Sequence, residues 1–155
     1  MARTVEGSSD AKGLKVALIV ARWHEDVTSR LMDAALDALV KHGASPDDLT
    51  VVRVPGSWEL PLAAAKLAAA RRHDALVALG CLIRGETPHF DVLAAETAAG
   101  LGRVGASSGI PVVFGVLTCE TLEQALSRAG GAAGNKGWDA ALAAIEMVSL
   151  YRRLG

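Results

Sequence analysis

Four mostly apolar runs divide this chain, and each has the length of a β-strand. They cover residues 16–20, 49–54, 75–79 and 112–117. Runs of this kind are typical of strands in a sheet that helices cover on both faces. The pattern therefore predicts four strands of one buried sheet.

Helical patterns fill the segments between these runs. They predict helices at 27–41, 60–72 and 90–104, and the first closes at a glycine, Gly43. A strand-helix alternation of this order requires right-handed crossovers and parallel strands. We therefore expect an α/β domain with helices on both faces of a four-stranded parallel sheet.

Two further helices are expected after the fourth strand. Residues 121–124 read Thr-Leu-Glu-Gln, which has the form of a capping box and begins a short helix that the glycines at 130–131 would end. A last helix begins at Gly134 or Asn135 and runs to about Leu154.

The last helix is apolar on nearly every side. From Trp138 to Tyr151 its only polar residues are Asp139, Glu146 and Ser149. A helix that packs on one sheet needs only an apolar stripe, so the surplus favours a second contact with another copy of the chain. The alternative is that its many alanines simply tolerate exposure.

Composition narrows the classes of function. The 155 residues include 16 Lys and Arg against 17 Asp and Glu, a net charge of -1, so nothing favours nucleic acid or an anionic membrane as a partner. Two cysteines form no disulfide framework, and no segment has the pattern of a signal peptide or a membrane span. The histidines and cysteines lack metal-ligand spacing, so no metal and no cofactor are expected. We expect a cytoplasmic protein.

The domain is predicted to cover residues 14–155. Residues 1–13 are polar and contain glycine, which predicts a flexible or partner-dependent arm.

Polar and aromatic residues follow the predicted strands. The carboxyl ends of parallel strands share one edge of a sheet, where ligands of such folds bind. Trp23 and Trp58 lie in two of these loops, and each could stack on a planar heterocycle or only cover a sheet end. Glu59 could bind a ligand's hydroxyl or amine groups or only complement a helix dipole.

The loop from Gly80 to His89 holds the other candidate chemistry. Gly85, Glu86 and Thr87 precede a helix and could offer N–H groups and a hydroxyl to an anion. His89 could transfer protons, since imidazole titrates near neutral pH, or could be structural. Arg84 could bind an anion or brace the loop against a carboxylate.

Several motifs, in order and at consistent spacing, together resemble the lumazine synthase family. They are Arg22-Trp23-His24, the Val54 to Pro61 segment, Gly80 with the Ile83 to Asp91 segment, the Gly109 to Gly115 segment, and Arg128-Ala129-Gly130 with Gly134-Asn135-Lys136-Gly137. The resemblance covers nearly the whole chain from about Val5. It implies a flavodoxin-like three-layer α/β/α fold and an arm that adds a strand to a neighbouring subunit.

The family condenses 5-amino-6-(D-ribitylamino)uracil with 3,4-dihydroxy-2-butanone 4-phosphate. The products are 6,7-dimethyl-8-ribityllumazine, phosphate and water, in the penultimate step of riboflavin biosynthesis. The resemblance also implies sites between subunits of a homo-oligomer, either a pentamer or a sixty-subunit shell of pentamers, and riboflavin synthase as a further partner. The compact segment from Arg128 to Gly137 favours the shell.

The resemblance assigns roles to individual residues. Trp23 stacks on the pyrimidine, and Ser57 and Glu59 hold the ribityl chain and the ring edge. His89 and Arg128 are the expected catalytic residues. His89 transfers protons, and Arg128 of the adjacent subunit contacts the phosphate. The remaining expected substrate-binding residues are Trp58, Cys81, Leu82, Ile83, Gly85, Glu86, Thr87, Phe114 and Lys136. Of these, Phe114 lines the pyrimidine side from the neighbouring subunit, and Lys136 lies near the same site.

The sequence departs from the common family pattern at a few positions. Trp23 and Trp58 replace a frequent phenylalanine, which preserves stacking. His24 replaces an asparagine, and its role stays open. The residues leave two other functions open: a thiol enzyme that pairs Cys81 with His89, and a noncatalytic flavin-binding or shell-forming relative.

Overall fold

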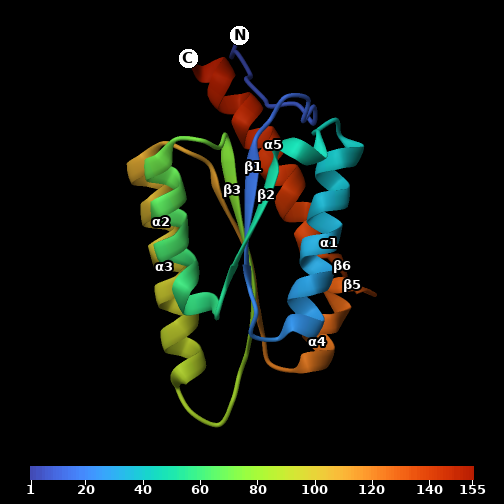
Figure 1. The fold of residues 1–155 in the computed structure, drawn as a ribbon, viewed down its shortest axis with the longest axis vertical. Coiled ribbons are helices and arrows are strands. Elements are labelled where there is room, and N and C mark those ends of the chain that lie inside the picture. Colours follow the sequence, from blue (N-terminus) through green and yellow to red (C-terminus); the bar gives the residue numbers. More distant parts are fainter.

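The chain folds as three layers, with helices on both sides of one parallel sheet (Figure 1). The computed structural model describes all residues from 1 to 155. The sheet has the order β2-β1-β3-β4, and every neighbouring pair is parallel. Its strands are β1 (Val16–Ala21), β2 (Leu49–Val54), β3 (Ala75–Ile83) and β4 (Val112–Cys119). The predicted fold class is therefore confirmed.

The helices divide between the two faces of the sheet. One face carries α1 (Glu25–Lys41), α4 (Leu122–Ser127) and α5 (Lys136–Leu154), and the other carries α2 (Leu60–Ala70) and α3 (His89–Ser108). Alternate residues of β1 enter two separate cores, because successive side chains of a strand point to opposite faces. Short 3-10 turns precede β2 (Pro46–Asp48) and α2 (Ser57–Glu59).

Two strands are longer than the sequence predicts by at least two residues. β3 continues through Gly80 and Cys81 to Ile83, and β4 continues to Cys119. The predicted loop therefore begins at Arg84, and the assignment of the four residues from Gly80 onward to a loop was wrong. Both strand ends pair with each other, with Gly80 opposite Val116, so the ladder continues past the glycine.

The edge strand β2 also differs from the prediction. Only Val54 of its six residues is buried, and Val51 is exposed. The expectation that helices cover every strand on both faces is correct for β1 and β3 and wrong for this edge.

The apolar surplus of α5 is largely covered within the chain. α5 packs along α1, where Gly137 lies so close to the backbone of Leu31 that no side chain would fit. Asn135 is the N-cap, since its side chain accepts hydrogen bonds from the backbone of Gly137 at 2.8 Å and Trp138 at 3.3 Å. The apolar pattern thus reflects contacts with a helix as well as with the sheet, and it is no longer by itself evidence for a second copy.

A short hairpin follows α4. The strands β5 (Ala129–Gly131) and β6 (Gly134–Asn135) pair antiparallel, and Gly130 and Gly134 adopt positive φ angles of 104° and 81°. The sequence predicts Gly130 and Gly131 as the end of a helix, whereas α4 already ends at Ser127. The hairpin leads the chain directly from α4 into α5.

The N-terminal arm lies against α5 at the end of the molecule where both termini are found (Figure 1). The backbone N–H of Ser8 donates to the hydroxyl of Ser149 at 3.0 Å, and Arg153 donates to the carbonyl of Glu6 at 2.7 Å. The arm contains no helix or strand, and its addition to a neighbouring sheet stays a prediction. None of the helices is both long and apolar enough to cross a membrane.

Candidate active site

The four loops after the strands meet at one edge of the sheet, opposite the termini (Figure 1). The backbone N–H groups of Arg22 and Trp23 donate to the carbonyls of Val54 and Pro55 at 2.8 and 3.0 Å. These bonds join the loop after β1 to the loop after β2. They place Trp23 beside the 55–59 segment, as the parallel sheet predicts.

A cavity of about 610 Å³ opens at this edge. Its volume lies in the range of small-molecule sites. It is lined by Trp23, Pro55, Gly56, Ser57, Trp58, Glu59, Cys81, Leu82, His89, Val92 and Leu93. Most of the predicted pyrimidine-binding residues therefore surround one space, and His89 borders it.

The indole of Trp23 is available to a ligand. Trp23 is 70% exposed, so it does not cover the sheet end. The imidazole of His24 meets its ring edge-on, with centroids 6.1 Å apart and planes at 81°. His24 itself has a left-handed φ of 62° immediately before α1 and does not line the cavity. Its ring contacts the side of Trp23, which leaves a face of the indole for stacking.

The 55–59 loop is fixed by contacts to the rest of the fold. One carboxylate oxygen of Glu59 accepts the N–H of Gly56 at 2.9 Å, and the buried hydroxyl of Thr97 on α3 donates to the carbonyl of Ser57 at 3.3 Å. Gly80 on β3 allows the hydroxyl of Ser57 to approach, because a Cβ there would lie 2.7 Å from it. The loop is therefore shaped before any ligand binds.

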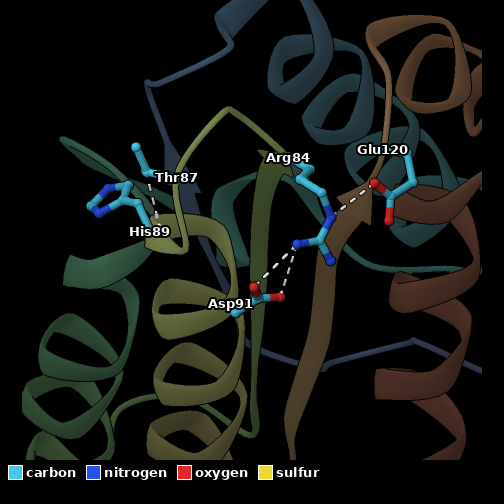
Figure 2. A network of polar contacts seen from close by, with 5 residues as sticks. All are labelled: Arg84, Thr87, His89, Asp91 and Glu120. Carbon is cyan, nitrogen blue, oxygen red and sulfur yellow. Dashed lines mark hydrogen bonds and ion pairs between the residues drawn. The ribbon is translucent and has the colours of Figure 1, made fainter.

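The 84–88 loop is exposed and makes few bonds of its own. None of the N–H groups of Gly85, Glu86 and Thr87 donates a hydrogen bond, whereas the N–H of His89 reaches the hydroxyl of Thr87 at 3.4 Å. These free donors precede the 20 residues of α3, whose N-terminus favours anions. In Figure 2 the imidazole of His89 and the side chain of Thr87 point away from Arg84.

Arg84 braces this loop. Its guanidinium forms ion pairs with Asp91 at 3.1 Å and Glu120 at 2.8 Å, and it lies 4.5 Å from the centre of the Phe90 ring. The hydrogen bond with Asp91 is the main cause that raises the pKa of Arg84. Of the two alternatives left open by the sequence, the structure shows the brace.

A second cavity, of about 380 Å³, contains the other predicted residues. It is lined by Phe114, Val116, Leu117, Thr118, Cys119, Arg128, Ala133, Lys136 and Asp139. Arg128 donates to the carbonyl of Gln124 at 3.0 Å, and the N–H of Lys136 donates to the carbonyl of Arg128 at 2.8 Å. No residue lines both cavities, so one chain does not bring Arg128 to His89.

Four predicted site residues line neither cavity. Ile83 ends β3 half-buried, and Gly85, Glu86 and Thr87 lie in the exposed loop. Sequence reasoning in turn missed several lining residues, among them Val92, Leu93 and Asp139. The first two follow His89 by three and four positions on α3, so the helical period could have found them.

The two cysteines are buried thiols. Burial, and then the neighbouring Cys119 and Asp26, raise the pKa of Cys81 from 9.0 to about 12. Burial likewise raises the pKa of Cys119, and Arg128 opposes that effect. Since the thiolate is the reactive form, Cys81 is a poor nucleophile at neutral pH, which argues against the thiol enzyme.

Comparison with known proteins gives a consistent result. Residues 13–152 match the family model described as 6,7-dimethyl-8-ribityllumazine synthase. Proteins of that name are similar over nearly the full length of both chains. The one from Chlorobaculum tepidum is 53% identical over 98% of each chain, and the one from Syntrophus aciditrophicus is 51% identical over 99% of this chain and 100% of its own.

Proposed function

Because this chain belongs to the 6,7-dimethyl-8-ribityllumazine synthase family, we propose that it catalyses the reaction of that name. It condenses 5-amino-6-(D-ribitylamino)uracil with 3,4-dihydroxy-2-butanone 4-phosphate and releases phosphate and water. The observation that carries this function is the open cavity beside Trp23, Ser57, Glu59 and His89 in a chain about half identical to proteins of that name. The enzyme is a transferase of riboflavin biosynthesis.

The pyrimidine occupies the cavity beside Trp23. Its ring stacks on the exposed indole, an arrangement that suits a planar heterocycle. Glu59 uses one oxygen to accept the N–H of Gly56, and its other oxygen accepts from the ribityl hydroxyls or the ring edge. Ser57 supports the same contact from the buried side of the loop.

The phosphate of the second substrate binds at the 85–87 segment. Three N–H groups without partners and the hydroxyl of Thr87 are suited to phosphate oxygens. The N-terminus of α3 adds its dipole. This placement puts the phosphate next to His89, which borders the pyrimidine cavity.

The chemistry requires positioning and proton transfer more than a strong nucleophile. The amine of the pyrimidine attacks the butanone carbonyl to form an imine with loss of one water, phosphate leaves, and the second nitrogen closes the ring with loss of a second water. His89 transfers the protons, which contributes about 10² to 10⁴ in rate. Holding both reactants in attack geometry contributes roughly 7–11 kcal/mol in favourable cases.

The second cavity completes the site in an assembled enzyme. Arg128, Phe114 and Lys136 lie together but apart from His89 in one chain, which supports their donation to a neighbouring subunit's pyrimidine cavity. The assembly is a pentamer or a shell of sixty subunits, and light scattering distinguishes these masses. Riboflavin synthase, which would consume the product, is the proposed protein partner.

The test is product formation from both purified substrates. The enzyme should produce lumazine fluorescence well above the spontaneous rate, with one phosphate released for each product. A noncatalytic flavin-binding or shell-forming relative would assemble and bind flavin yet leave the spontaneous rate unchanged. That outcome would reject the enzymatic function.

A further inference from the structure

Arg84 lies outside both cavities but connects the parts of the fold that define the 84–88 loop (Figure 2). We propose that Arg84 is a positioning residue that holds this loop in the conformation that receives the butanone phosphate. The proposal rests on the proposed function. It adds a residue whose effect on the reaction is transmitted through the loop.

Arg84 holds the loop at its two ends, one through its backbone and the other through its side chain. The backbone N–H of Arg84 donates to the carbonyl of Cys119 at 2.9 Å, which fixes the first residue to β4. One terminal nitrogen of its side chain lies 3.1 Å from both carboxylate oxygens of Asp91, in the first turn of α3. The backbone of Arg84 therefore holds the start of the exposed segment, and its side chain holds the end.

Two further contacts fix the guanidinium itself. Its Nε donates to Glu120 at 2.8 Å, and its Cζ lies 4.5 Å from the centre of the Phe90 ring. Glu120 is held in turn, since its backbone N–H donates to the side chain of Gln124 at 2.7 Å. Arg84 thus joins β3, β4 and the start of α3, and several directed contacts restrict it more than one surface ion pair would.

Charge argues against direct binding of the phosphate by Arg84. Its single positive charge lies between the negative charges of Asp91 and Glu120, so the three side chains together carry a formal net charge of -1. In Figure 2 the guanidinium points toward these carboxylates, while Thr87 and His89 lie on the other side of the loop. An anion at the free N–H groups is therefore bound by the loop and not by Arg84.

The loop depends on its ends because little else orders it. A side chain at Gly85 would contact nothing within 4 Å, and the N–H groups of residues 85–87 have no partners. Without the ion pairs of the Arg84 side chain, here called the clamp, the phosphate must order the 85–87 segment when it binds, which costs conformational entropy. The pyrimidine should be affected little, because its own loop is held by the hydrogen bond that Thr97 donates to Ser57 and the one that Glu59 accepts from Gly56.

The test is the steady-state kinetics of Arg84→Met, which keeps most of the side-chain length over Phe90 and removes the charge. We expect the KM for the butanone phosphate to rise about fivefold, the upper range for loss of exposed ion pairs. The KM for the pyrimidine and kcat should stay within about twofold of the parent. Arg84→Lys, which keeps the charge without the planar guanidinium and its several donors, should recover part of the loss.

Lys41→Met is the matched control. Lys41 also pairs with a carboxylate, Asp37 at 2.9 Å, and lies 5.8 Å from the centre of an aromatic ring, Trp138, but it is at the far end of α1. Its loss should leave both KM values unchanged. If Arg84→Met folds poorly, Asp91→Asn breaks the same clamp from α3 and should raise the same KM.

The outcomes separate this proposal from the proposed function. A parent enzyme that forms no lumazine rejects the function. A parent that forms lumazine, with an Arg84→Met variant whose KM for the phosphate substrate is unchanged, rejects only the clamp. A variant in which kcat and both KM values worsen together with the melting temperature also rejects it, because that pattern indicates a general structural role.

Discussion

The two loops proposed to bind the substrates, 55–59 and 84–88, lie at the same edge of the sheet but are stabilised differently. In the first, Ser57 is buried and its carbonyl accepts from Thr97, while Glu59 bonds back to Gly56. In the second, residues 85–87 are exposed and their N–H groups have no partners. One loop is preformed by the core, and the other is held only at its ends.

This difference matches the chemistry of the two ligands. A planar ring with several hydroxyls gains most from a site whose donors and acceptors are already placed, because little entropy is lost on binding. A phosphate is bound by N–H groups that must be free of other partners, and it must also leave during the reaction. An exposed loop with unpaired donors and fixed ends meets both requirements.

The largest effect is expected for His89→Ala, at the position where the two loops meet. His89 borders the pyrimidine cavity and follows the phosphate loop, so its loss should lower kcat by about 10² to 10⁴ while some turnover remains. Residual turnover is expected because both loops still position their substrates. The measurement is kcat at saturating concentrations of both substrates.

His73→Ala is the control for that variant. His73 lies just before β3, at the opposite edge of the sheet, and its loss should leave kcat unchanged. An unchanged kcat in His89→Ala would remove this histidine from the mechanism.

The preformed loop is tested by Thr97→Val, with a smaller expected effect. The change removes the buried hydrogen bond to Ser57, which should lower the free energy of unfolding by about 1 kcal/mol. It should raise the KM for the pyrimidine about fivefold and leave the KM for the phosphate substrate unchanged. Equal changes in both KM values would show that the loops are not independent.

Thr28→Val, in α1, is the matched control for Thr97→Val. Thr28 is also fully buried on a helix, but its hydroxyl has no hydrogen-bond partner. Valine should therefore stabilise the protein by about 1 kcal/mol and leave both KM values unchanged. Denaturant unfolding measures both stability changes.

Cys81 should have the smallest effect on activity, although it lines the pyrimidine cavity. Because burial raises its pKa to about 12, it is a neutral thiol at pH 7, and Cys81→Ala should retain turnover. Loss of turnover on this change, with the fold intact, would favour the thiol enzyme.

The same shift predicts how stability depends on pH. The folded state keeps the proton of Cys81 above pH 9 while the unfolded state loses it. The contribution of Cys81 to the free energy of unfolding is therefore fully present below about pH 9. It declines by about 1.4 kcal/mol per pH unit between about pH 9 and about pH 12. Thermal unfolding of Cys81→Ala across this range should show a shallower decline than the parent.

The fold was predictable because the apolar pattern of the sequence matches the buried residues over most of the sheet. β1 and β3 are buried on both faces, so their apolar runs stand out. The end of β3 was missed because Gly80 is a usual loop residue, whereas here it makes room for Ser57 beside the strand. That close approach depends on tertiary structure, which local sequence does not encode.

The candidate site was predictable in part for a similar reason. Residues at strand ends, such as Trp23 and Glu59, could be placed by topology alone. The division of Arg128 and His89 between two cavities follows from the edge position of β4 and the short hairpin after α4. The ion-pair partners of Arg84 come from two separate parts of the fold, Asp91 on α3 and Glu120 after β4, so only the structure could decide between an anion ligand and a brace.

Hydrogen exchange of the two loops tests the central claim most directly. In the free enzyme, the N–H groups of Gly56 and Glu59 should be protected, whereas those of residues 85–87 should exchange rapidly. The butanone phosphate should slow exchange at 85–87 and change the 55–59 loop little. Equal exchange of both loops in the free enzyme, or no slowing at 85–87 with the phosphate bound, would contradict the account.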